Sequence, residues 1–145
     1  MPARFPLEAV LKVRENAELR EERVLSQILA QINETRRSIE RIDSDLAGTL
    51  AARLSEVQHP LLASHLHSSY ARRALLQQAR NDLDQQISQW FHLRDRQMSI
   101  YQAARRDREM ITDLREQHQR NQERQLARLE QIALDETFLA RRGRG

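Results

Sequence analysis

A proline near the middle of the chain, Pro60, separates two long stretches of sequence with helical periodicity. It is the only proline between Pro6 and the C-terminus, and it closes the polar segment 55–60. Proline has no backbone N–H, and its ring clashes with the carbonyl four residues earlier, so it ends or sharply kinks a helix. Because helical sequence continues on both sides, we interpret this segment as the tip of a helical hairpin.

The composition favours long helices over a compact globular core. Of the 145 residues, 39% are hydrophobic and 31% are charged, but only 4% are aromatic and only three are glycine. Turns use glycine and closed cores use large rings. A chain poor in both, and dominated by Ala, Glu, Leu, Arg and Gln, is typical of coiled coils.

Apolar residues recur every seven positions in the first stretch, at Leu25, Ile32, Ile39 and Leu46. Ile28 and Ile42 add a second row, and the mean spacing of about 3.5 residues keeps a continuous seam against another helix. Gly48 costs about 1 kcal/mol relative to alanine inside a helix. Since the apolar pattern continues beyond it, we predict one helix over about residues 7–57 with a soft spot at Gly48.

The second stretch has a longer ladder of the same period, without proline or glycine before Gly143. We predict a turn at about residues 58–61 and a second helix over about residues 61–141. The ladder includes Leu62, Leu76, Leu83, Trp90, Ile111, Ile132 and Leu139. The predicted second row consists of Ala79, Leu93, Ile100 and Leu114, with Ile87 and Tyr101 flanking it. The expected fold is all-α: a long antiparallel two-helix coiled-coil hairpin with a longer, overhanging second helix.

The two predicted helices differ in length, so the first covers the second only to about residue 115. Beyond that point the ladder turns polar, at His118, Asn121 and Gln125. A helix without an intramolecular partner tolerates such residues. We therefore expect the last part of the chain to project as a single helix, whose surface carries Arg115, Arg120, Arg124 and Arg128.

Few residues are spaced for catalysis or metal binding. The chain has no cysteine, which excludes disulfides and Cys-based zinc sites. His65 and His67 are two positions apart, so they face different sides of a helix and do not share a metal. Carboxylates are scattered without a cleft, and no phosphate-binding glycine loop occurs. We expect no enzyme activity, cofactor or metal.

The charge pattern bears on nucleic acids and membranes. Lys12 is the only lysine among 24 basic residues, and the formal net charge is +3. Nucleic-acid binding needs basic residues gathered on one surface, whereas Arg and acidic residues alternate here, as in 105–109. No apolar run reaches the roughly 20 residues of a membrane span, and the N-terminus lacks a signal-peptide apolar block. These features favour a cytoplasmic protein with solvated, ion-paired helix surfaces.

The two ends of the chain carry short motifs. An N-terminal Phe-x-Leu-x-x-Val-Leu-x-x-Arg spans Phe5 to Arg14, and Leu134-Asp135-Glu136 lies near the C-terminus. With a shorter helix, a proline-marked turn and a longer helix between them, these motifs resemble the FliJ/YscO family of type III secretion proteins, flagellar or injectisome. The resemblance covers the whole chain.

The resemblance implies a hairpin similar to the central stalk of rotary ATPases. Members of that family sit in the pore of the hexameric secretion ATPase, promote its activity, and contact the export-gate membrane protein and substrate chaperones. By this resemblance the chain is a bacterial, non-enzymatic stalk or escort protein, monomeric and peripheral to the inner-membrane secretion apparatus. Its arginine-rich, lysine-poor surface favours the injectisome branch.

Two surfaces are candidates for these contacts. For the ATPase we select Arg14, Arg120, Arg124 and Arg128. For the export gate we select residues near the tip, where apolar side chains exceed what two paired helices need: Leu46, Leu50, Leu62, Leu66 and Tyr70.

Two other interpretations stay open. A generic coiled-coil adaptor or scaffold would homodimerise through the same seam, and its oligomeric state would reveal it. A helical nucleic-acid-binding protein would lose affinity steeply with salt.

Overall fold

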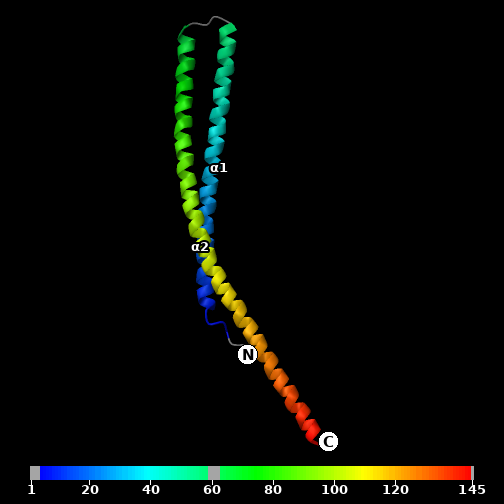
Figure 1. Ribbon diagram of the computed structural model, residues 1–145. Coiled ribbons are helices and arrows are strands. Elements are labelled where there is room, and N and C mark those ends of the chain that lie inside the picture. Colours follow the sequence, from blue (N-terminus) through cyan, green and yellow to red (C-terminus); the bar gives the residue numbers. More distant parts are fainter. Residues whose placement is uncertain (1–3, 59–62, 145) are drawn as a thin grey trace. The chain divides into compact units, whose positions relative to one another are not determined.

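The computed structural model describes residues 4–58 and 63–144, and the side chains of residues 4–54 and 67–144. This part of the chain forms two helices, α1 (Glu8–Gln58) and α2 (Ala63–Arg144), and contains no strand (Figure 1). The helices pack against each other. The prediction of an all-α hairpin with a longer second helix is confirmed.

The outer ends of both helices carry favourable terminal residues. Before α1, the amide of Glu8 donates to the carbonyl of Phe5 at 3.3 Å, and Glu8 places a negative charge at the positive end of the helix dipole. α2 continues through Gly143 to Arg144, past the predicted end near residue 141. Arginines in its last turn suit the negative end of the dipole.

The helices pair in two compact units, which are described separately. The first unit consists of Met1–Glu21 and Tyr101–Gly145, and the second of Glu22–Ile100. In the second unit Arg53 stacks on the ring of Tyr70, and Asp43 pairs with Arg80. Residue numbers fall along α1 as they rise along α2, so the pairing there is antiparallel.

The ladder predicted in the first helix forms the seam of the second unit. Leu25 and Ile32 are buried, and Ile39 and Leu46 are half-buried. Two polar residues are also buried in this unit, Thr35 and Gln97. The Thr35 hydroxyl donates to the carbonyl of Gln31 at 2.8 Å, which satisfies it within its own helix.

The second row predicted for α2 is largely wrong. Ala79 is half-buried, but Leu93, Ile100 and Leu114 are 39%, 49% and 40% exposed. The row that faces α1 lies four positions after each ladder residue. It consists of Arg80, Ile87, Arg94, Tyr101, Arg108 and Arg115, all half-buried. Arginine can occupy such positions because its aliphatic stem packs along the seam while the guanidinium reaches the edge.

Gly48 lies inside continuous α1, where an added Cβ would meet no atom within 4 Å. We expect Gly48→Ala to raise the free energy of unfolding by about 0.5–1 kcal/mol, because alanine loses less backbone entropy in a helix. Urea unfolding followed by circular dichroism measures the change. The reverse substitution at the neighbouring exposed residue, Ala47→Gly, should lower stability by a similar amount. A loss on Gly48→Ala would show that the helix bends there in solution.

Candidate partner-binding surfaces

A half-buried ion pair joins the helices in the first unit. Arg108 donates from Nε to Oε2 of Glu18 at 2.6 Å and from Nη2 to Oε1 at 3.2 Å. The Glu18 side chain is only 16% exposed and the Arg108 side chain only 26%. The hydrogen bond from Arg108 lowers the pKa of the Glu18 carboxyl, against the opposing effect of burial. Because the contact is bidentate, it fixes orientation as well as charge.

Looser ion pairs flank this contact on the same unit. Arg14 Nη1 lies 3.5 Å from Asp107 Oδ2, and Arg115 Nη1 lies 3.7 Å from Glu8 Oε1. Both pairs are substantially exposed, and exposed pairs contribute little to stability. Arg14, one of the arginines predicted to bind the ATPase, is therefore accessible but already has a carboxylate neighbour.

The N-terminal turn packs over α2 beyond residue 115, where the first helix was expected to stop covering the second. The rings of Phe5 and His118 are 5.5 Å apart, tilted at 58°. His118 was predicted to lack an intramolecular partner, and this prediction is wrong. Arg115 was predicted to lie on the surface of the projecting helix; its side chain is 42% exposed, but it stands beside Glu8 of the first helix. The cause is the irregular segment before α1, which carries the cover past residue 115.

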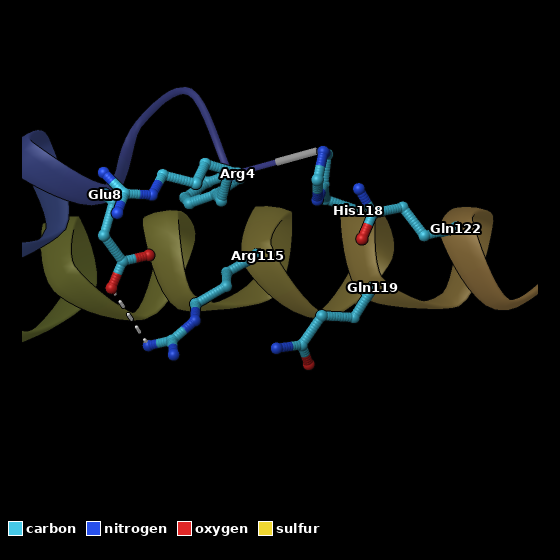
Figure 2. Close-up of a pocket in the computed structure, with 7 residues that line it drawn as sticks. Arg4, Glu8, Arg115, His118, Gln119 and Gln122 are labelled. Atoms are coloured by element: carbon cyan, nitrogen blue, oxygen red, sulfur yellow. Dashed lines mark ion pairs between the residues drawn. The ribbon is translucent and has the colours of Figure 1, made fainter. Parts of the chain in front are cut away.

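This turn and α2 border an open pocket of about 450 Å³, lined by Arg4, Phe5, Glu8, Arg115, His118, Gln119 and Gln122. Figure 2 shows Glu8 and Arg115 joined by their ion pair, with Gln119 on the same side and His118 and Gln122 on the other. Sequence reasoning missed this pocket. The available signals were Phe5 in the N-terminal motif and a histidine at a ladder position.

Past the pocket, α2 has no partner in the described chain. Every side chain from Glu123 to Arg144 is exposed. Arg120 and Arg124 line one shallow groove of about 310 Å³ with Gln117 and Asn121, and Arg128 follows one turn later. Arg14 does not join them, because its neighbour Asp107 lies about 20 Å before Arg120 along α2.

The same segment exposes large apolar side chains. These are Leu126, Leu129, Ile132, Leu134, Phe138 and Leu139. Within the residues that the structure describes, nothing covers them. Large apolar side chains that are exposed together in one segment are typical of an interaction surface.

The residues selected for the export gate fall in the second unit and are only partly accessible. Leu50 and Tyr70 are exposed, with the Arg53 guanidinium 3.9 Å from the centre of the Tyr70 ring, whereas Leu46 is half-buried in the seam. Leu62 and the side chain of Leu66 lie outside the described part of the chain.

Sequence reasoning also missed one apolar side chain in the second unit. Leu75 is 73% exposed and lies close to Tyr70 along α2. Its position directly before the ladder residue Leu76 could have identified it, because neighbouring residues on a helix cannot both face one seam.

Metal sites and membrane spans are absent from the described residues. No group of three His, Cys, Asp or Glu side chains in them is placed to hold a metal ion. Neither described helix contains an apolar window of the length needed to cross a bilayer.

The sequence as a whole matches one protein family, described as "Flagellar FliJ protein", over residues 3–145. The chain belongs to the FliJ family. The resemblance drawn from the terminal motifs is thereby confirmed. FliJ proteins are non-catalytic structural or escort proteins of flagellar and type III secretion, a family role that implies contacts with secretion components.

The matching family is the flagellar one, so the preference for the injectisome branch gains no support from it. Comparison with curated proteins and with solved structures finds no significant match.

Proposed function

We propose that this FliJ-family protein is a non-enzymatic stalk or escort protein that binds the hexameric secretion ATPase and the export gate. The observation that carries the proposal is family membership over residues 3–145. The unpaired end of α2 supports it, since a single helix with free charges and exposed leucines is suited to contacting a surrounding protein. In this proposal the protein acts as a monomeric hairpin in the cytoplasm, beside the membrane apparatus, and substrate chaperones are further partners.

The ATPase contact is proposed at Arg120, Arg124 and Arg128. Positions four apart lie on one side of a helix, so the three guanidinium groups form a row. None of them makes an ion pair within the described ranges. Guanidinium groups bind carboxylates in a bidentate manner, which suits them to acidic loops of a ring protein. Arg14 is a secondary contact, because Asp107 already neutralises it.

The gate contact is proposed near the tip, at Leu50 and Tyr70, together with Leu62 and Leu66 from the sequence. Leu46 is half-buried, so it would support this surface from the seam instead of touching a partner directly. Docking on Tyr70 requires access to the ring face that Arg53 does not cover.

Replacing Arg120, Arg124 and Arg128 together by Glu tests the ATPase contact. We expect the protein to stimulate ATP hydrolysis by its cognate secretion ATPase and the triple variant to lose most of that stimulation, because like charges replace the guanidinium row. The matched control replaces Arg20, Arg23 and Arg96 by Glu, which changes net charge equally on other exposed surfaces. Stimulation kept by the triple variant would discard this contact surface.

Two further outcomes decide between functions. No binding and no stimulation by the unaltered protein would contradict the stalk proposal. A stable dimer in sedimentation experiments would then favour a generic coiled-coil adaptor.

A further inference from the structure

The pocket under the N-terminal turn is rich in hydrogen-bond donors that the fold does not use. Arg4 is exposed and makes no ion pair within the described residues. Arg115 lies 3.7 Å from Glu8, which is longer than a hydrogen bond, so its donors stay available. Gln119 adds an amide on the Arg115 side (Figure 2). Among the described residues of the lining, Glu8 is the only carboxylate.

An apolar side chain, Phe5, lies on the His118 side of the pocket, where Arg4 also lies, across from Arg115 (Figure 2). The Phe5 ring is half-buried against His118 and lines the same pocket. The volume of about 450 Å³ falls within the range of roughly 300–1,000 Å³ usual for ligand pockets. A ligand that fits must therefore offer both an anionic group and an adjacent apolar group.

We propose that this pocket binds an acidic peptide segment, whose carboxylate is held by Arg4 and Arg115 and whose neighbouring apolar side chain packs on Phe5. A polyphosphate is disfavoured, because its dense negative charge would meet the Glu8 carboxylate and it has no apolar group to pack on the Phe5 ring. The site adjoins the start of the Arg120–Arg128 row along α2, but it is lined by other residues, and the proposal does not depend on the ATPase or gate contacts.

The probe is a blocked tetrapeptide, acetyl-Glu-Leu-Glu-Leu-amide, titrated into the full chain. The His118 ring signals in NMR spectra report binding at the pocket, and a helical circular dichroism spectrum verifies each variant's fold. We expect saturable shifts with the acidic peptide. Arg4→Gln and Arg115→Gln should each weaken binding about tenfold, the usual effect of losing one charge-assisted hydrogen bond. Arg141→Gln, at an exposed arginine in the last turn of α2, should leave the affinity unchanged.

Three results would overturn the proposal. The first is equal binding of acetyl-Gln-Leu-Gln-Leu-amide, in which no carboxylate is present. The second is competition by inorganic phosphate at the same concentration as the peptide, which would reduce the pocket to a simple anion site. The third is the absence of shifts at millimolar peptide. Because only the isolated chain is used, none of these outcomes affects the proposed ATPase contact.

Discussion

Replacing Ile32 by alanine should lower the free energy of unfolding by about 2–4 kcal/mol. Ile32 is 2% exposed at the centre of the α1 seam, in a hairpin with few other fully covered apolar side chains in its described part. The substitution removes apolar surface and leaves a space that neighbouring side chains fill only partly. Alanine's better helix propensity returns a few tenths of a kcal/mol, which places the net effect toward the lower end.

Urea unfolding followed by circular dichroism measures this change. The matched control is Leu75→Ala, which removes a comparable side chain that is 73% exposed and should shift stability by less than about 0.5 kcal/mol. Equal effects at both positions would mean that the seam is not formed in solution or that α2 is covered by a second molecule.

Glu18→Gln should destabilise the protein by about 1–2 kcal/mol near pH 7. The substitution removes the charge that pairs with Arg108 while keeping the shape of the side chain. The value lies between those of exposed and fully buried pairs, because both side chains are largely but not completely covered. Glu34→Gln is the matched control: its contacts with Arg37 and Arg41 are exposed, so the expected loss is below about 0.5 kcal/mol.

The effect of Glu18→Gln should also depend on pH. Because folding lowers the pKa of the Glu18 carboxyl, its stabilisation is complete above the pKa of the unfolded chain, about 4.3, and is lost as pH falls through the lower folded-state pKa. The stability difference between wild type and variant should therefore be constant from about pH 7 to pH 5 and shrink at more acidic pH. A difference that persists unchanged in acid would show that packing, and not the ion pair, is responsible.

Periodicity was sufficient to predict the fold class and the seam of α1. A seven-residue apolar repeat that includes Leu25 and Ile32 predicts a seam packed against a second helix. Pro60 indicated where the two helical stretches are divided. Periodicity failed for the second row of α2, because ranking by hydrophobicity selected Leu93 and Leu114 over the arginines directly after them. Only the register of the helices reveals that Arg108 meets Glu18 across the seam.

The candidate surfaces were predictable only in part, for a related reason. Sequence identifies an arginine but not whether a carboxylate stands beside it. Arg14 has such a neighbour in Asp107, whereas Arg120 and Arg124 have no ion pair in the described chain. The contact of Phe5 with His118 was missed because it depends on a short irregular turn, which has no periodicity to detect.

The row of half-buried arginines on α2 favours one register of the two helices over neighbouring registers. If the helices slid by one heptad in the first unit, Arg108 would leave Glu18 and could face Leu11, which is buried. In the second unit, the same displacement would move Arg80 from Asp43 to Leu50 or Arg36. Each misplaced guanidinium would lose its carboxylate where water is partly excluded. Within each unit the arginine ion pairs therefore oppose sliding of one helix along the other, in either direction.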